Sequence, residues 1–166
     1  LDQYRVQLNM GNTYLRSVPF SDLKAFETIF SNLPQRLHLQ LANSSTVRYA
    51  QLFDIPQQAE VFCNRGTSGI DGSTATAIGA ALINQNPSLL VTGDLSFFYD
   101  INGLWNDHIP SNFRVILINN QGGGIFRILP GEKDSPKYDT YFETIHGRNA
   151  RQISKAFGLK YKSVKT

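Results

Sequence analysis

The sequence of 166 residues predicts an α/β protein with a doubly wound, mostly parallel sheet and helices on both of its faces. Short, near-continuous apolar runs at 89–91 and 113–118 are typical of parallel strands that are buried on both sides. Segments with helical periodicity alternate with these runs, as they do in doubly wound folds. The length, together with 41% hydrophobic and 17% charged residues, suits one domain with a buried core. We therefore expect a single domain over 1–166.

The first half of the chain predicts a helix, a strand, a short helix and a second strand. Residues 1–20 are a candidate linker, and the absence of an initiator Met suggests a piece of a longer protein. Ser21 and Asp22 cap a helix that ends before Pro34. The elements that follow are a strand at 37–41, a short helix to Leu52, a polar run at 54–60 and a strand at 61–63.

The second half continues the alternation of strands and helices. Small residues predict a helix at 73–81 that packs closely on the sheet, and the glycines at 122–124 end the regular pattern. The other expected elements are a strand at 89–91, a helix at 97–105, a strand at 113–118, a loop at 130–141, a helix at 148–157 that stops at Gly158, and a strand from Leu159.

Charge and composition exclude several classes of function. The formal charge is +3, and nine of the sixteen Lys and Arg residues lie between Arg127 and Lys165, scattered among acidic and apolar residues without a nucleic-acid motif. We expect anionic small molecules and no nucleic acid as partners. The single cysteine, Cys63, fits a cytoplasmic protein, and no apolar run is long enough for a membrane span. Dinucleotide, phosphate-loop and nucleophile-elbow fingerprints are absent, which argues against a kinase or a hydrolase.

Two polar residues follow neighbouring predicted strands. Asp94 comes after one strand and Asn120 after the next, and a single right-handed crossover places their carboxyl ends side by side. Their oxygens and the carbonyl of Gly122 suit Mg²⁺, or Mn²⁺, and leave positions for phosphate. The helix that begins near 95–96 aims free N–H groups at the same place, which favours a bound diphosphate. The alternative is that Asp94 only caps its helix and that 119–122 is a turn.

These motifs carry a resemblance to a known family. Gly93-Asp94, followed by Asn119-Asn120, resembles the motif of thiamine-diphosphate enzymes, but Leu95 stands where most of them have Gly. The run 93–102 resembles instead the 2-succinyl-5-enolpyruvyl-6-hydroxy-3-cyclohexene-1-carboxylate synthase (SEPHCHC synthase, MenD) family. The loop 64–72, the segment with Ser44 and Arg48, and the residues after the metal motif are similar to the same family. The likeness runs from about Leu41 to Leu129.

The resemblance implies a role for each matching residue. It implies a thiamine-diphosphate-binding fold with Asp94, Asn120 and the Gly122 carbonyl as metal ligands. Arg65, with Ser44 and Arg48, would face the substrate carboxylates, for which the guanidinium fork is suited. The implied cofactor contacts are Gly93, Asp94, Leu95, Ser96, Asn120, Gly122, Ile70 beneath the bent cofactor, and Ile125, Phe126 and Leu129 near the reacting centre.

Each of these residues also has a structural alternative. Arg65 can pair with Asp71 in its own loop, and Arg48 can be a solvated helix residue. The apolar residues Ile125, Phe126 and Leu129 can be ordinary core. His108 and His146 are expected on the surface or in loops.

The resemblance also implies a reaction for the whole protein. SEPHCHC synthases are transferases of menaquinone biosynthesis that decarboxylate 2-oxoglutarate and add the resulting succinyl semialdehyde carbanion to isochorismate. They need thiamine diphosphate, a divalent metal, and the N-terminal pyrimidine-binding domain of a partner subunit in a dimer or tetramer. That domain supplies an activating glutamate, which none of Glu27, Glu60, Glu132 or Glu143 matches. We therefore expect this chain alone to be inactive. The alternatives are another thiamine-diphosphate decarboxylase or carboligase, such as an acetolactate synthase-like enzyme, or a non-catalytic assembly module.

Overall fold

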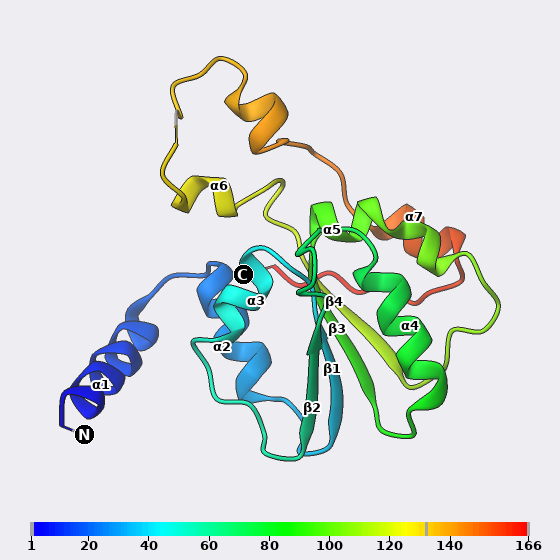
Figure 1. Ribbon diagram of the computed structural model, residues 1–166, viewed down its shortest axis with the longest axis horizontal. Helices are drawn as coiled ribbons and strands as arrows, with labels where there is room; N and C mark the ends of the chain where they lie inside the picture. Colours follow the sequence, from blue (N-terminus) through cyan, green and yellow to red (C-terminus); the bar gives the residue numbers. More distant parts are fainter. Residues whose placement is uncertain (1, 132, 166) are drawn as a thin grey trace.

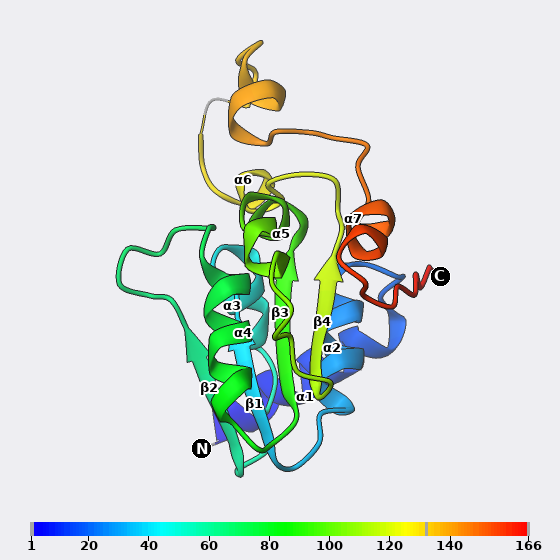
Figure 2. The same cartoon turned by 90° about the vertical axis from the view of Figure 1, so that its right-hand side faces the viewer.

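The computed structural model describes residues 2–131 and 133–165 and confirms the doubly wound α/β fold. Four strands form one sheet in the order β2-β1-β3-β4, and all three neighbouring pairs are parallel. Figure 2 shows all four arrows pointing toward the same edge of the sheet. The strands are β1 (Leu37–Leu41), β2 (Ala59–Cys63), β3 (Ser88–Gly93) and β4 (Phe113–Ile118).

Helices lie on both faces of the sheet, as Figure 1 shows. Helix α1 occupies most of the candidate linker and extends away from the sheet. No helix in the described ranges has the length and apolar character that a membrane span requires. The helices are α1 (Asp2–Ser17), α2 (Asp22–Ser31), α3 (Ser45–Ala50), α4 (Ser73–Ile83), α5 (Asp94–Tyr99), the 3₁₀ turn η1 (Ile101–Leu104), α6 (Ile125–Ile128), the π-helical turn η2 (Tyr138–Phe142) and α7 (Arg151–Ala156).

One face of the sheet is covered by α2 and α3. Helix α2 begins as expected, because the Ser21 side chain accepts a hydrogen bond from the Lys24 N–H at its first turn. Its rings Phe26 and Phe30 are buried against the sheet. The strand residues in this core are Leu37, Leu39, Leu41, Leu89 and Val91. The alternating leucines of β1 therefore form one apolar face, as the sequence predicts.

The opposite face is covered by α4, α5, η1 and α7. Small residues on α4 allow close contact, and Ala77 and Ala81 are 1% and 2% exposed. The other buried members of this core are Ile78, Leu90, Phe97, Leu104, Phe113 and Ala150. Strand β3 contributes to both cores, since Val91 packs against α2 and α3 while Leu90 packs on this side. The strand before Asp94 is thus held rigidly from two sides.

The expected helix at 97–105 is wrong in its start and its continuity. Helix α5 begins at Asp94 and ends at Tyr99, and η1 follows as a separate turn. The break falls at Asp100, which has φ −117° and whose carboxylate accepts a hydrogen bond from the Ala75 N–H at 2.8 Å. Asp100 therefore satisfies a free N–H group at the start of α4 instead of continuing its own helix.

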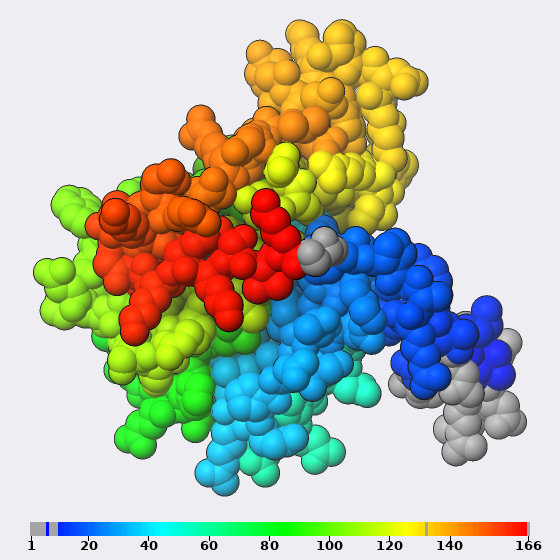
Figure 3. All heavy atoms as spheres, turned by 180° about the vertical axis from the view of Figure 1, so that it is seen from behind, coloured from blue at the N-terminus to red at the C-terminus, as the bar shows by residue number. Residues whose placement is uncertain are grey.

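The C-terminal strand expected from Leu159 is also wrong. The chain after α7 has no regular structure through residue 165, and α7 is shorter than the expected helix at 148–157. Gly158 ends it with φ +70°, and the Leu159 N–H donates to the Ser154 carbonyl. Leu159 then packs against the α4 and α5 core, so the chain turns back beside α7. Figure 3 shows this terminal segment in red lying over the surface beside the blue N-terminal helices.

Other boundaries also differ from the sequence predictions, such as that of β3, which spans Ser88–Gly93 instead of 89–91. Strand β2 begins at Ala59, two residues early, because Ala59 and Glu60 pair with Leu37 and His38 despite the polar run. Helix α4 continues to Ile83. The loop expected at 130–141 is wrong in its last four residues, which belong to η2, where the Glu143 N–H donates to the Tyr138 carbonyl.

Two glycines on the α4 side predict opposite changes in stability. A Cβ on Gly103 would lie 2.8 Å from the Ala75 nitrogen and 2.9 Å from its Cα, so Gly103→Ala should lower the free energy of unfolding by about 1–3 kcal/mol. Gly79 is exposed on α4, and a Cβ on it would meet nothing within 4 Å. Gly79→Ala should therefore raise the free energy of unfolding by about 0.5–1 kcal/mol. Urea denaturation of both variants measures the difference, and equal changes would contradict the packing of η1 on α4.

Candidate cofactor and metal site

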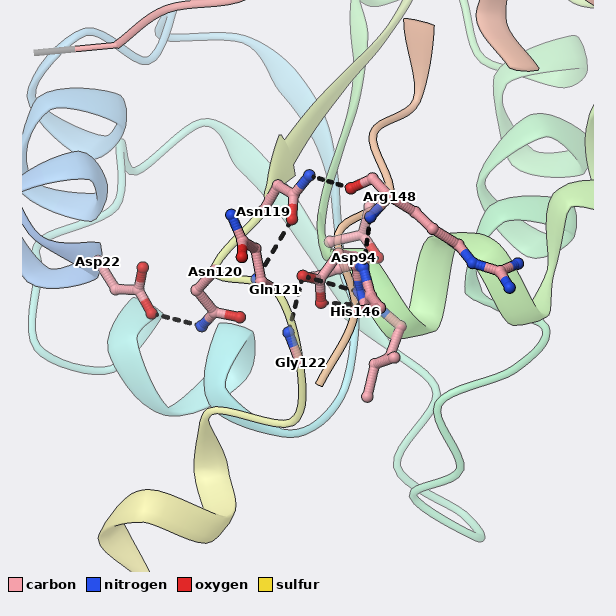
Figure 4. A network of polar contacts seen from close by, with 11 residues as sticks. Asp22, Asp94, Asn119, Asn120, Gln121, Gly122, His146 and Arg148 are labelled. Atoms are coloured by element: carbon pink, nitrogen blue, oxygen red, sulfur yellow. Dashed lines mark hydrogen bonds and ion pairs between the residues drawn. The ribbon is translucent and has the colours of Figure 1, made fainter. Parts of the chain in front are cut away.

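The structure brings Asp94 and Asn120 to the same edge of the sheet. Strands β3 and β4 are neighbours, with Gly93 paired to Ile118, so both polar residues leave the sheet at its carboxyl edge. Figure 4 shows them on either side of Gly122, with Asp22 and His146 beside them. The expected juxtaposition of adjacent carboxyl ends is therefore found.

The Asp94 carboxylate is buried and has no lysine or arginine partner in the part of the chain that the structure describes. The residue is 1% exposed. Its Oδ1 accepts a hydrogen bond from the Leu95 N–H at 2.7 Å, and its Oδ2 accepts one from the Gly122 N–H at 3.1 Å. The Nε2 atom of His146 lies 3.3 Å from Oδ2. A buried carboxylate in these surroundings is stabilised by a bound cation.

Burial raises the pKa of Asp94 above its ordinary value, and the opposing effects of the Leu95 N–H, His146 and the Gly122 N–H are smaller. The folded chain then keeps the proton at pH values where the unfolded chain has lost it. Without a divalent cation, the contribution of this carboxyl to stability is present below the unfolded pKa of about 3.9 and is lost as pH rises through the folded pKa. Urea denaturation in EDTA should show a decline over this window that Asp94→Asn reduces. An identical slope in the variant would contradict this assignment.

Asn120 is held by a residue that sequence reasoning treated only as a helix cap. Its Nδ2 donates a hydrogen bond to Asp22 Oδ2 at 2.7 Å, across 98 positions in the chain. Because the amide nitrogen faces Asp22 at the start of α2, the orientation of the Asn120 Oδ1 is fixed. Among the described residues, no donor is bonded to that oxygen. It is free to act as a metal ligand.

Close contacts with backbone and with the Asn120 side chain require the glycines after β4. Gly122 has φ +154°, and a Cβ on it would lie 2.7 Å from the Glu143 carbonyl oxygen. A Cβ on Gly124 would lie 2.7 Å from the Asn120 Nδ2. The Gly122 carbonyl accepts one hydrogen bond, from the Gly124 N–H at 2.9 Å, and a carbonyl has a second lone pair. The loop therefore keeps its acceptor capacity and leaves no room for side chains.

The donor set fits a hard divalent cation such as Mg²⁺ better than a metal that prefers nitrogen or sulfur ligands. Within the described ranges, no three His, Cys, Asp or Glu side chains gather as a metal cluster. One carboxylate, one carboxamide oxygen and one backbone carbonyl are oxygen ligands of the kind that Mg²⁺ takes together with phosphate.

Three buried hydroxyl groups lie in the first turns of α4 and α5. Ser96 is 4% exposed, and its Oγ has no hydrogen-bond partner among the described atoms. The buried hydroxyls of Ser73 and Thr74, in the first turn of α4, also have no hydrogen-bond partner among the described atoms. Sequence reasoning had not singled out this pair, although two hydroxyl residues directly after a glycine-rich loop were a visible signal. Buried polar atoms without partners are uncommon, so these three hydroxyls stand out among the buried polar groups.

The residues expected to face substrate carboxylates are only partly brought together. Arg65 is exposed and donates from Nη1 to the Asn43 Oδ1 at 2.9 Å. The alternative pairing of Arg65 with Asp71 is not among the ion pairs of the described residues. Arg48 is exposed on α3, and Ser44 precedes that helix with φ +69°. Backbone conformations of this kind cluster at functional sites.

Asn43 organises the loop that carries Arg65, and sequence reasoning had assigned it no role. It is 2% exposed at the end of β1. Its Nδ2 donates to the carbonyls of Asn64 and Gly69, both at 2.7 Å, while its Oδ1 accepts from Arg65. This single buried amide ties both ends of the loop to the sheet, beside half-buried Ile70.

The apolar residues after the metal motif lie on and beside α6. Ile125 is 8% exposed, Phe126 is half-buried, and Leu129 is 40% exposed. The Phe126 carbonyl accepts a hydrogen bond from the Tyr138 hydroxyl at 2.5 Å, which attaches η2 to this segment. The ordinary-core alternative therefore suits Ile125 but not Leu129.

The described glutamates, none of which matches the activating glutamate of the family, have other partners. Glu27 pairs with Lys24, and Glu60 accepts a hydrogen bond from Asn84. Glu143 is buried and pairs with Arg127. Glu132 lies outside the described residues.

Fold and site together define a doubly wound α/β domain of the class that binds cofactors at the carboxyl edge of its sheet. The chain belongs to the family of the thiamine pyrophosphate enzyme, C-terminal TPP binding domain, whose model matches residues 43–166. This result confirms the expected thiamine-diphosphate-binding fold.

Curated relatives confirm the resemblance to SEPHCHC synthases. The chain is 56% identical to the 2-succinyl-5-enolpyruvyl-6-hydroxy-3-cyclohexene-1-carboxylate synthase of Flavobacterium psychrophilum, over 97% of this chain and 29% of the relative. It is 46% identical to the synthase of the same name from Bacteroides fragilis, over 89% of this chain and 26% of the relative. The chain thus spans less than a third of the length of these relatives.

Two solved structures share the fold at low sequence identity. A thiamine diphosphate-dependent 4-hydroxybenzoylformate decarboxylase of Rhodococcus jostii RHA1 matches 90% of this chain and 29% of its own, with a TM-score of 0.69 and 19% identity. A benzoylformate decarboxylase from Polynucleobacter necessarius matches 91% of this chain and 29% of its own, with a TM-score of 0.63 and 19% identity.

Proposed function

We propose that this chain holds the diphosphate of thiamine diphosphate through Mg²⁺, or Mn²⁺, with Asp94, Asn120 and the Gly122 carbonyl as ligands. The observation that carries the proposal is the buried Asp94 carboxylate, which has no lysine or arginine partner in the described chain and lies beside Asn120 at one sheet edge. Helix α5 begins at this carboxylate, and its first turn carries the buried Ser96 hydroxyl, which has no hydrogen-bond partner among the described atoms.

The remaining residues divide into cofactor and substrate contacts. Gly93 and Leu95 flank Asp94 and contribute backbone to the diphosphate site. Ile70 would support the cofactor, while Ile125, Phe126 and Leu129 would shield the reacting centre from water. Arg65, Arg48 and Ser44 would bind carboxylates of the substrates, and the exposed guanidinium groups are accessible for this purpose.

For the whole protein we propose the activity of a SEPHCHC synthase. It would act in the cytoplasm on 2-oxoglutarate and isochorismate in menaquinone biosynthesis, as a homo-oligomer. Bound thiamine diphosphate supplies the electron sink for decarboxylation and carbon–carbon bond formation. The chain's own residues position the cofactor and neutralise its charge. The pyrimidine-binding domain of a partner subunit would supply the activating glutamate, so this chain alone would be inactive.

Two other functions remain as alternatives to be tested. Another thiamine-diphosphate decarboxylase or carboligase would use the same metal ligands, but Leu95 and the loop at 64–72 favour the synthase. A non-catalytic assembly module would have no need for a buried Asp94 beside Asn120.

An assay of carbon dioxide release tests the substrate assignment. The natural protein that carries this chain should convert 2-oxoglutarate to an isochorismate adduct only when thiamine diphosphate and Mg²⁺ are present. Turnover of pyruvate with no use of 2-oxoglutarate would favour the carboligase alternative. Substantial turnover by this chain alone would contradict the proposed need for a second domain.

A further inference from the structure

Segment 143–148, which we call the strap, lies against the loop 119–123, which contains the proposed ligands Asn120 and Gly122. The Gly123 N–H donates to the Glu143 carbonyl at 2.6 Å, and the His146 N–H donates to the Gln121 carbonyl at 3.2 Å. The Asn119 Nδ2 donates to the Arg148 carbonyl at 2.9 Å. These three bonds place the strap beside the loop along its whole length, as Figure 4 shows for His146 and Arg148.

His146 is the strap side chain that reaches Asp94. Its Nε2 lies 3.3 Å from the Asp94 Oδ2, and its side chain is 11% exposed. The ring packs edge-on against Phe98 of α5, with ring centres 5.4 Å apart. The imidazole is therefore held between the strap, α5 and the carboxylate.

The hydrogen bonds assign the proton on the His146 ring. The Nδ1 atom accepts a hydrogen bond from the Arg148 N–H at 3.1 Å, so a neutral ring carries its proton on Nε2. That proton faces Asp94 Oδ2. The approach is not aligned as a full hydrogen bond, and Nε2 has no other partner among the described atoms. The contact acts as an electrostatic restraint on one side of the carboxylate.

We propose that His146 is a positioning residue, which holds the Asp94 carboxylate for the divalent cation and couples the strap to metal binding. Groups that contact a ligating carboxylate fix its orientation, and their loss commonly weakens metal affinity by about 10–100-fold. Leu95 and Gly122 hold the same carboxylate through backbone N–H groups, which substitution does not remove. His146, in contrast, contacts this carboxylate through its side chain, which substitution does remove. The inference rests on the proposed metal site.

Two conservative variants separate the two nitrogen atoms of the ring. In His146→Gln, the amide nitrogen takes the place of Nε2 and still donates toward Asp94. In His146→Asn, the amide oxygen takes the place of Nδ1 and still accepts from the Arg148 N–H, but the side chain no longer reaches Asp94. His146→Ala lacks both functions. A merely structural role of the strap turn would be rescued by Asn, whereas positioning of Asp94 would be rescued by Gln.

Paramagnetic resonance of free Mn²⁺ tests the proposal in the natural protein saturated with thiamine diphosphate. We expect His146→Ala and His146→Asn to weaken Mn²⁺ binding by about 10-fold and His146→Gln to restore it. Unchanged affinity in His146→Ala, or rescue by Asn and not Gln, would overturn the role of His146 and leave the metal site intact. Failure of the wild-type protein to bind Mn²⁺ with the cofactor would overturn both the inference and the proposed function. Matching circular dichroism of the variants confirms that the fold is retained.

Discussion

Asp94→Ala should abolish retention of thiamine diphosphate by the natural protein, with a loss of affinity of more than about 100-fold. The reason is that Asp94 is the one carboxylate among the three proposed ligands, and loss of a direct ligand exceeds the 10–100-fold cost of losing a group that only supports one. Cofactor that remains bound after gel filtration, measured as fluorescent thiochrome, gives the result. Because Asp94 is buried, Asp94→Ala can also impair folding.

Two further variants separate binding from folding. Asp94→Asn keeps the shape and the acceptor oxygen for a backbone N–H group while removing the charge, and it should also lose the cofactor. Asp107→Ala changes an exposed carboxylate outside the site and should bind like the wild type. Retention of thiamine diphosphate by a folded Asp94→Asn protein would mean that the diphosphate is held elsewhere.

Leu90→Ala should lower the free energy of unfolding by about 3 kcal/mol. Leu90 is fully buried in β3 and packs among the residues of α4, α5 and η1. Removing its side chain leaves a cavity in this core, in the strand that leads to Asp94. Urea denaturation of this chain measures the change.

Leu82→Ala is the matched control for this substitution. Leu82 lies on α4 with 53% of its surface exposed, so its removal creates no cavity. Its effect should stay within about 0.5 kcal/mol. Similar losses in the two variants would contradict the placement of Leu90 in the core on the α4 face.

Most of the sheet could be predicted from hydrophobic pattern alone. Strands β1, β3 and β4 are apolar runs bounded by turn residues, and a parallel strand buried on both faces leaves that signal in the sequence. The errors fall where a side chain serves another element. Asp100 caps α4 instead of extending α5, and Leu159 packs into a core instead of joining the sheet. Such tertiary uses leave no periodicity to detect.

The candidate site, too, could be predicted only in part from the sequence. Asp94 and Asn120 were predicted to be neighbours because topology alone brings the ends of β3 and β4 together. The residues that hold these two are far apart in sequence, since Asp22 bonds to Asn120 across 98 positions and His146 reaches Asp94 from a loop after β4. Asn43 likewise acts through carbonyls of a loop more than twenty residues away. No local motif identifies such contacts.

Calorimetric titration of thiamine diphosphate into the natural protein, with and without Mg²⁺, tests the central claim most directly. A site built from one carboxylate, one carboxamide and one carbonyl, with no lysine or arginine of the described chain paired to Asp94, depends on the metal to hold the diphosphate. We predict saturable binding in the presence of Mg²⁺ that is lost in EDTA. Equal binding in EDTA would contradict the assigned ligands, and no binding in either condition would contradict the proposed cofactor.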